Sequence, residues 1–356
     1  MKDNMDNRET SVDVVFEYMG DGCSVPKDIT SVWFKEGVQK IGSYAFINCN
    51  SLESVTLPST VTEIGMAAFN NCKNLRVVTM NGGLQKIGNE AFINCFALES
   101  ITLPSTLTEI GNYAFCDCSN LRELTLNDGL RKIGFKAFYK CSSLNIITLP
   151  STLTEICVRA LYGCSNLKEV ILNDGLQKIG NNAFQFCSSL ESIKLPPTVT
   201  EIGDYAFRYC INLREVELNG VPQYIRIIAF HNCDALERFL FPTISYRLEN
   251  LIQTSRWEEL EDKLNEVRGV VHWESEELFV STLTHHNWND IRMDLCRIIR
   301  LVSYYELKEA TTTFELALWK SKLDQAGASN ITNRAAYRID VPGPVKDTML
   351  QYLDHI

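Results

Sequence analysis

Apolar and polar positions along residues 26–242 form a pattern that repeats every 23 residues. The repeat is clearest at nine cysteines: Cys49, Cys72, Cys95, Cys118, Cys141, Cys164, Cys187, Cys210 and Cys233. Two neighbouring columns keep the same interval, an alanine that begins at Ala45 and an almost invariant phenylalanine that begins at Phe46. Repetition at this length predicts structurally equivalent units that stack on one another.

One unit of 23 residues cannot bury its own apolar side chains, so the pattern predicts a solenoid in which coils bury each other. Within a coil, Val55 and Leu57 have the spacing of a short strand that faces the interior. Ser54 and Thr56 then face outward, and equivalent strands pair in parallel. The segment 64–72, IGMAAFNNC, is interpreted as a turn followed by a short helical piece.

The pattern Leu-x-x-Val-x-Leu, followed by Ile-Gly-x-x-Ala-Phe-x-x-Cys-x-x-Leu, resembles the leucine-rich repeat of the BspA type. The resemblance covers residues 26–242, the predicted repeat solenoid of nine cysteine-marked coils. It implies a curved, right-handed coil stack with a parallel β-sheet on its concave face. It also implies protein–protein recognition or adhesion, and it brings no catalytic residue to this chain.

A glycine column is interrupted in two coils. Glycine stands at the equivalent position elsewhere: Gly42, Gly65, Gly88, Gly111, Gly134, Gly180 and Gly203. Cys157 and Arg226 replace it. Either this position does not require a positive φ, or those two coils are locally distorted. Leu161 also replaces phenylalanine in the coil of Cys157, so we expect that coil to pack differently.

A charged column alternates in sign, which makes the full period 46 residues. The column consists of Lys40, Glu63, Lys86, Glu109, Lys132, Glu155, Lys178 and Glu201, and then ends at Tyr224. Like charges stacked at strand spacing would repel, whereas alternation makes every neighbour attractive. Because an exposed ion pair contributes only about 0.2–1 kcal/mol, we expect the column to set the register more than to add stability.

The cysteines have three interpretations. Disulfides between adjacent coils are geometrically allowed, but an odd set of equivalent thiols has no preferred pairing. Metal sites need clustered Cys or His, and only Cys116 and Cys118 are close in sequence. The third interpretation is a buried thiol that fills the corner of each coil, and so many free thiols fit a reducing compartment. We therefore expect no metal and no cofactor.

The outward positions of the predicted strands lose their regularity in the later coils. Threonine fills one outward column from Thr56 to Thr148, and charged and apolar residues follow it. The break in the pattern indicates a candidate partner-binding surface made of Ile146, Glu169, Ile171, Lys194, Glu215 and Glu217. The alternative is that these are ordinary solvated strand residues.

Both ends of a solenoid expose core and need caps. Residues 1–25 are interpreted as an N-terminal cap, in which Val14, Phe16 and Tyr18 alternate as a strand over the first coil. Residues 243–356 are interpreted as an α-helical capping domain. Its predicted helices have capping signals at Ser255 with Glu258 and at Asn287 with Asp290, and a third apolar face at Leu307, Ala310, Phe314 and Leu318.

The net charge of −10 argues against nucleic acid as the main partner. The first residues lack the apolar run of a signal peptide, and no apolar stretch is long enough for a membrane span, so a cytoplasmic location is expected. No catalytic triad, phosphate loop or metal motif is evident, and we expect the chain not to be an enzyme. The sequence favours a non-catalytic scaffold that binds a protein or peptide; the alternative is a cell-surface adhesin or antigen of the BspA type.

Overall fold

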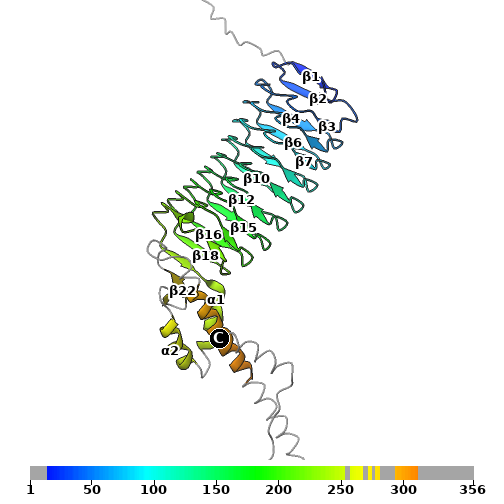
Figure 1. The fold of residues 1–356 in the computed structure, drawn as a ribbon. Helices are drawn as coiled ribbons and strands as arrows, with labels where there is room; N and C mark the ends of the chain where they lie inside the picture. The colour runs from blue at the N-terminus through cyan, green and yellow to red at the C-terminus, as the bar shows by residue number, and fades with distance from the viewer. Residues whose placement is uncertain (1–13, 253–256, 268–271, 275–276, 281–292, 312–356) are drawn as a thin grey trace, which may run out of the picture. The chain divides into compact units, whose positions relative to one another are not determined.

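The computed structural model describes residues 14–252, 257–267, 272–274, 277–280 and 293–311 (Figure 1). The chain divides into two compact units, Met1–Ser303 and Tyr304–Ile356. The first unit contains a parallel β-solenoid, as predicted, and helices follow the last coil. The predicted domain limits at 25 and 242 stay predictions.

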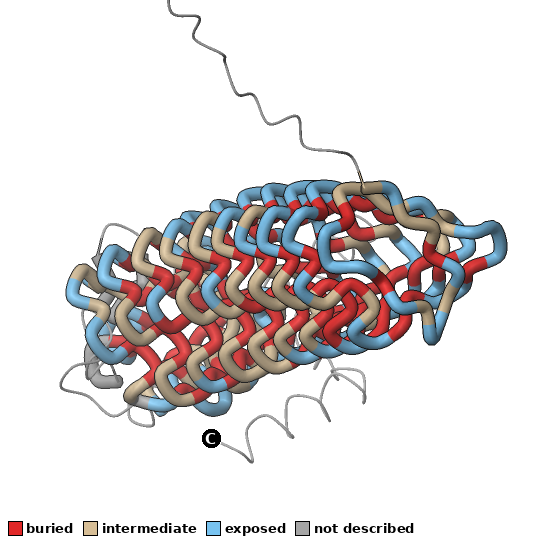
Figure 2. Tube along the Cα trace, turned by 90° about the horizontal axis from the view of Figure 1, so that it is seen from above, coloured by how far each residue is buried: buried red, intermediate tan, exposed pale blue. Residues whose placement is uncertain are grey.

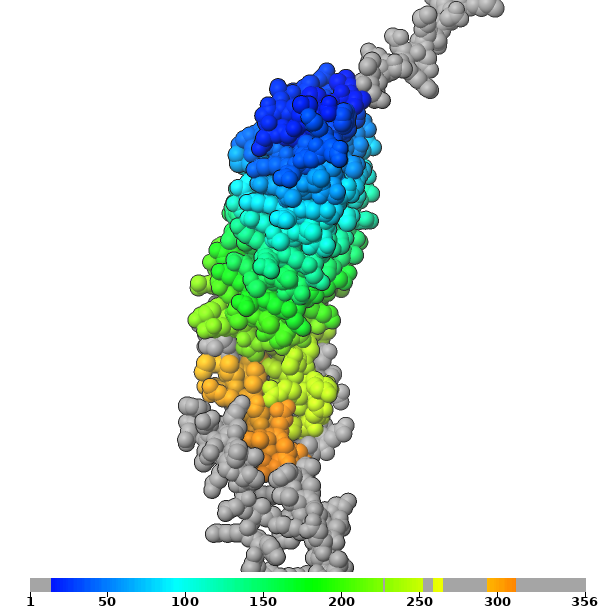
Figure 3. Space-filling model, turned by 90° about the vertical axis from the view of Figure 1, so that its right-hand side faces the viewer, coloured from blue at the N-terminus to red at the C-terminus, as the bar shows by residue number. Residues whose placement is uncertain are grey.

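Each coil places one strand of three or four residues on the same side of the stack (Figure 1). These strands are β2 Ser31–Phe34, β4 Ser54–Leu57, β6 Val77–Met80, β8 Ser100–Thr102, β10 Glu123–Thr125, β12 Ile146–Thr148, β14 Glu169–Ile171, β16 Ser192–Leu195, β18 Glu215–Leu218 and β20 Arg238–Leu240. The strands from β4 to β14 form one parallel sheet in chain order, and β16, β18 and β20 pair in parallel in a second. In Figure 3 the chain colours follow one another as layers, coil by coil.

A second strand of two residues lies in each coil, which the sequence analysis missed. These strands are β3 Lys40–Ile41, β5 Glu63–Ile64, β7 Lys86–Ile87, β9 Glu109–Ile110, β11 Lys132–Ile133, β13 Glu155–Ile156, β15 Lys178–Ile179, β17 Glu201–Ile202 and β19 Tyr224–Ile225. They too pair in parallel, from β3 to β11 and again from β13 to β19.

The short helical piece predicted at 64–72 is wrong, because consecutive turns occupy residues 66–71. Ala67 and Asn71 adopt left-handed φ angles of 52° and 60°. Their N–H groups donate to the next coil, at the carbonyl oxygens of Asn89 (2.8 Å) and Ile93 (2.9 Å). N–H groups used between coils cannot form the bonds of a helix within the coil. The last coil alone among those described contains a 3₁₀ helix at this place, η1 Ile227–Phe230.

Buried residues recur at equivalent positions of successive coils along the stack (Figure 2), and their side chains form the core. The rings of Phe69, Phe92 and Phe115 are fully buried and nearly parallel, with centroids 5.1 and 5.2 Å apart. Phe138 continues this ladder, and Leu161 interrupts it. Each coil therefore fills its interior with the same groups as its neighbours, as the repeat predicted.

The glycine column is explained by crowding and not by backbone conformation, since none of its members has a positive φ. A Cβ atom on Gly111 would lie 2.6 Å from the carbonyl carbon of Gly88 in the preceding coil. Where Cys157 replaces glycine, the N–H bond to the preceding coil is not formed and β13 does not pair with β11. Arg226 keeps that bond at 3.2 Å, against 2.8 Å for Gly180. The glycine position therefore tolerates a larger side chain, but the backbone hydrogen bond to the preceding coil is then lengthened or lost.

We expect Gly111→Ala to lower the free energy of unfolding by about 1–3 kcal/mol, since backbone atoms must move apart to admit the methyl group. Gly82→Ala is the matched control: no heavy atom lies within 4 Å of its added Cβ. That substitution should be neutral or stabilising by up to about 1 kcal/mol. Urea unfolding followed by circular dichroism measures both. Equal effects of the two substitutions would contradict the crowding explanation.

The alternating charged column forms ion pairs, as predicted. Lys40 lies 3.3 Å from Glu63, and Lys178 lies 3.5 Å from Glu201. Glu109 contacts the lysines on both sides, Lys132 at 2.9 Å and Lys86 at 3.6 Å, and the hydrogen bond from Lys132 lowers the pKa of its carboxyl group. Glu155, in the coil of Cys157, forms no ion pair with another described residue. Among the described residues, the charge pairing is thus interrupted on both sides of Glu155, and it is also absent between Glu63 and Lys86.

The N-terminal strand predicted near Tyr18 is confirmed as β1 Val15–Tyr18, which pairs in parallel with β2. Tyr18 is buried, and its hydroxyl oxygen accepts the N–H of Gly42 at 2.8 Å. Its ring also packs on Phe46, with centroids 5.1 Å apart. Tyr18 thereby joins the added strand to the first complete coil.

A small helical region follows the solenoid, as predicted, and it also contains a β-hairpin that the sequence did not predict. Helix α1 Pro242–Ile252 begins at a proline, a residue favoured in the first turn, and helix α2 Trp257–Val267 follows; residues 293–311 are also helical. Between α2 and the helical residues 293–311, β21 His272–Glu274 and β22 Glu277–Val280 form an antiparallel hairpin. Strand β22 pairs with β20, so the hairpin satisfies the open edge of the last coil. Ser255, Asn287, Asp290, Phe314 and Leu318 lie outside the described residues.

Candidate functional site

The six residues of the predicted partner-binding surface all lie on the outward side of four successive strands, β12, β14, β16 and β18. We call this surface the strand-face site. Ile146 is the direct partner of Glu169, and Lys194 is the direct partner of Glu217. The structure therefore brings the six residues together in two neighbouring groups; whether they bind a partner stays a prediction.

The first group exposes apolar side chains. Ile146 is 43% exposed and Ile171 is 41% exposed. The two are diagonal neighbours, because Ile146 pairs with Glu169 and Ile171 pairs with Thr148. At this offset, Cα atoms are about 7–8 Å apart and long side chains can touch. The pair forms a small apolar surface on a sheet face that is otherwise largely polar.

The second group is compensated in charge. Lys194 Nζ lies 3.0 Å from Glu217, and Arg238 donates to Glu215 Oε1 at 2.7 and 2.9 Å through Nη2 and Nε. Glu215 and Glu217 are half-buried, whereas Lys194 is exposed. A partner would meet ion pairs here instead of isolated carboxylates, which the sequence pattern did not indicate.

The sheet is interrupted between the two groups, since β14 ends one sheet and β16 begins the next. The interruption lies one coil after the change at Cys157 and Leu161. The strand-face site thus spans the place where the regular stacking of the solenoid is broken.

The cysteine ladder is structural. Its thiols are free, and Cys95 Sγ donates to the carbonyl oxygen of Phe69 at 3.2 Å, as Cys118 Sγ does to that of Phe92. Burial raises the pKa of the Cys95 thiol to about 12, so it stays protonated at neutral pH. A protonated thiol in the core is neither a nucleophile nor a metal ligand.

Within the described part of the chain, no group of three or more His, Cys, Asp and Glu side chains is arranged to hold a metal ion. Its helices include none of the length and apolar character that crossing a bilayer requires.

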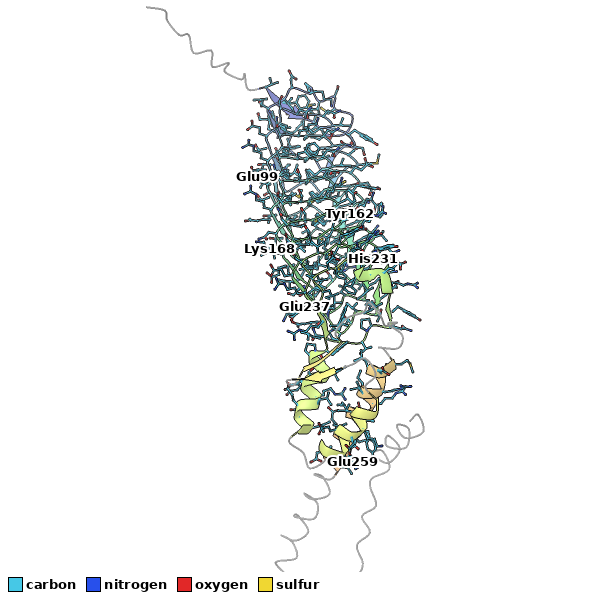
Figure 4. All side chains as sticks on the ribbon, turned by 90° about the vertical axis from the view of Figure 1, so that its left-hand side faces the viewer. Glu99, Tyr162, Lys168, His231, Glu237 and Glu259 are labelled. Atoms are coloured by element: carbon cyan, nitrogen blue, oxygen red, sulfur yellow. The ribbon has the colours of Figure 1, made fainter. Side chains whose placement is uncertain are left out.

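A second surface, missed by the sequence analysis, lies on the opposite side of the coils from the strands. Figure 4 places Tyr162 and His231 there, away from Glu99, Lys168 and Glu237. We call it the turn-side cluster. Its rings are Tyr139, Tyr162, Phe186 and Tyr209, and its cations are Lys136, Lys140, Arg159 and Arg208. Aligning the sequence with itself at an offset of 23 residues reveals these rings, because Tyr139 and Tyr162 share one column and Phe186 and Tyr209 share the next.

The repeat family described as the BspA type leucine rich repeat region matches residues 18–145 and 131–252, more than half of the chain. The chain belongs to the BspA-type leucine-rich repeat family. Proteins of this repeat class are generally non-enzymatic scaffolds. No curated protein matches this BspA-type chain.

Several bacterial leucine-rich repeat structures are similar to this BspA-type chain. A leucine-rich repeat protein from Bacteroides ovatus is 30% identical over 59% of this chain and 54% of its own, with a TM-score of 0.54. The T. pallidum leucine-rich repeat protein is 29% identical over 50% of this chain and 78% of its own, with a TM-score of 0.44. The pneumococcal vaccine antigen PcpA is 22% identical over 60% and 68%, with a TM-score of 0.37. The chain spans about half the length of the Bacteroides ovatus protein.

Proposed function

We propose that this BspA-type chain is a non-catalytic scaffold that binds a protein or peptide through the strand-face site. The family supports a binding role, since leucine-rich repeats suggest protein binding. The coil stack supports it physically, because a solenoid presents an extended and rigid surface on which many side chains keep fixed spacing.

The observation that carries the proposal is the exposed diagonal pair of Ile146 and Ile171. Apolar side chains with a charged rim are typical of the centre of a recognition surface. Here Glu169 lies beside the pair, and the ion pairs of Lys194 and Glu215 follow in the next strands. A partner that covers both isoleucines would remove apolar surface from water and keep its polar groups at the edge.

The test compares affinity capture by the wild-type chain with capture by Ile146→Thr/Ile171→Thr, followed by measurement of the affinity for the captured protein. We expect the affinity to fall at least about tenfold, since each lost apolar contact costs roughly 1 kcal/mol or more. Threonine keeps the β-branched shape that suits a strand. Val77→Thr is the matched control, because Val77 is 46% exposed on the same face of β6, outside the strand-face site.

An unchanged affinity in the double variant, with an unchanged unfolding curve, would remove recognition from the strand-face site. Equal losses in the double variant and in Val77→Thr would show that the whole sheet face binds without a defined site. A catalytic activity would overturn the non-catalytic role if it stays with the chain through purification and is abolished by one polar substitution.

For the location of the chain, we propose the cytoplasm, and the support is chemical. The cysteines of the described coils are free and numerous, as is usual in a reducing compartment. The family itself favours a second candidate, a cell-surface adhesin or antigen. Brief protease treatment of intact cells separates them: a cytoplasmic chain stays intact, and a surface chain is cut.

A further inference from the structure

The aromatic rings of the turn-side cluster pack against one another. Tyr139 and Tyr162 are stacked with centroids 4.7 Å apart, and Phe186 and Tyr209 are stacked at 4.8 Å. Tyr162 meets Phe186 edge to face at 5.4 Å, which joins the two pairs into one row. Rings in such a row present mainly edges and hydroxyl groups outward. The edge of an aromatic ring carries partial positive charge.

The cations of the cluster are held by the same rings. Lys136 Nζ lies 4.8 Å from the ring centroid of Tyr139, and Lys140 Nζ lies 5.5 Å from it. The guanidinium of Arg208 lies 4.7 Å from the ring centroid of Tyr209. Unlike the lysines of the charged column, none of these cations forms an ion pair with a carboxylate of the described residues.

The arginines retain unused hydrogen-bond donors. The Nε atoms of Arg159 and Arg208 are buried and have no acceptor among the described residues. A buried donor without a partner costs free energy, because its hydrogen bonds to water are lost and not replaced. Burial raises the pKa of Tyr162, and the positive charges of Arg159 and Arg208 oppose that shift. Both arginines therefore act electrostatically on the same hydroxyl group, and each keeps an Nε donor without a hydrogen bond.

We propose that the turn-side cluster binds an acidic peptide segment, with its carboxylates on Arg159 and Arg208. This site is separate from the strand-face site and goes beyond the proposed function. A carboxylate can accept two parallel bonds from the Nε and Nη edge of a guanidinium once that side chain turns outward. Nearby Asp117 accepts a hydrogen bond from the thiol of Cys116 at 3.2 Å and keeps its negative charge, but the cations of the cluster outnumber it, although the chain carries −10 overall. The complementary ligand is therefore anionic.

The length of the cluster sets the length of the peptide. Lys140 lies in the fifth cysteine-marked coil and Arg208 in the eighth. Three coil intervals at strand spacing span about 14 Å, which an extended peptide covers in about five residues. Single-stranded nucleic acid is the less suitable anion, since its bases bind to exposed ring faces and those of the row are covered by neighbouring rings.

The test uses a fluorescein-labelled hexaglutamate peptide and measures fluorescence anisotropy with the full chain at low salt. We expect saturable binding that weakens at least tenfold in Arg159→Gln/Arg208→Gln. The matched control is Arg76→Gln/Arg122→Gln, which removes the same charge from exposed arginines outside the cluster; there the affinity should change less than twofold. Lys136→Gln/Lys140→Gln provides a second variant with intact arginines, and it should weaken binding by about fivefold.

The proposal is overturned if hexaglutamate does not bind saturably. It is also overturned if both arginine double variants weaken binding equally, which would indicate only long-range attraction. A six-nucleotide single-stranded DNA that binds more tightly than the peptide would overturn it as well. If Arg159→Gln/Arg208→Gln does not fold by circular dichroism, the lysine variant decides. None of these variants alters the strand-face site, so failure here is distinguishable from failure of the proposed function.

Discussion

The coil stack is expected to lose stability steeply as the pH rises above about 9. The cause is the row of buried thiols that includes Cys95 and Cys164. Burial raises the pKa of both to about 12, and it raises the pKa values of Cys118 and Cys141 well above the usual value of a thiol. A thiol in the unfolded chain titrates at about 8.5–9.

The direction of the effect follows from proton binding. Between the unfolded and folded pKa values, the unfolded chain has lost a proton that the folded chain keeps, so raising the pH favours unfolding. Below the unfolded pKa the full stability is present. Each thiol costs about 1.4 kcal/mol per pH unit in this interval. For the eight buried ladder thiols the sum is on the order of 10 kcal/mol per unit, comparable with the total stability of an ordinary domain.

Urea unfolding under reducing conditions at pH 7, 8, 9 and 10 measures the effect, with circular dichroism as the signal. Cys118→Ala should reduce the slope of the unfolding free energy against pH by the contribution of one thiol, about 1.4 kcal/mol per pH unit. Cys23→Ala is the control, because Cys23 is half-buried and lies outside the ladder. A midpoint that is the same at pH 7 and pH 10 would show that the ladder thiols are not buried as protonated groups.

Phe115→Ala is expected to lower the free energy of unfolding by about 3–5 kcal/mol. The ring is fully buried and stacked on both sides, 5.2 Å from Phe92 and 5.4 Å from Phe138. Its removal leaves a cavity between coils that are themselves held in register by hydrogen bonds, so the neighbours can close it only partly. Because coils interact with their nearest neighbours, the loss should weaken two interfaces at once.

Two further variants define this result. Phe96→Ala changes a side chain that is 39% exposed, and it should alter stability by no more than about 0.5 kcal/mol. Phe115→Leu copies the natural residue at Leu161 and should cost less than Phe115→Ala, since it leaves a smaller cavity. If Phe115→Ala and Phe96→Ala had equal effects, the ring ladder would not be a main source of stability.

The sequence predicted the solenoid, the inward strand positions and the charged column because each depends on contacts between equivalent residues of adjacent coils. Lys40 and Glu63 lie next to each other because a separation of 23 residues places them at the same position of adjacent coils. Leu161 and Cys157 likewise marked the coil in which β13 does not pair with β11. In a repeat protein, alignment of the chain with itself gives most of the contacts directly.

The remaining features depend on contacts that the repeat does not encode. The hairpin β21–β22 forms against the open edge of β20, a partner that local helical spacing cannot reveal. The turn-side cluster was missed because its rings occupy two different columns, and the contact of Tyr162 with Phe186 crosses between them. At the strand-face site, the sequence located the six positions but not the ion pairs that compensate Glu215 and Glu217.

The turns that replace the expected helical pieces give the stack an electrical direction. On that side of the coils, N–H groups such as those of Ala67 and Asn71 point to the following coil, and the carbonyl oxygens that accept them point back. Peptide dipoles aligned in this way add along the stack, as they do along an α-helix, whereas those of the sheets largely cancel. On the turn side the hydrogen bonds therefore run in one direction, from each coil to the next, and that side of the stack has a polarity that its sheets lack.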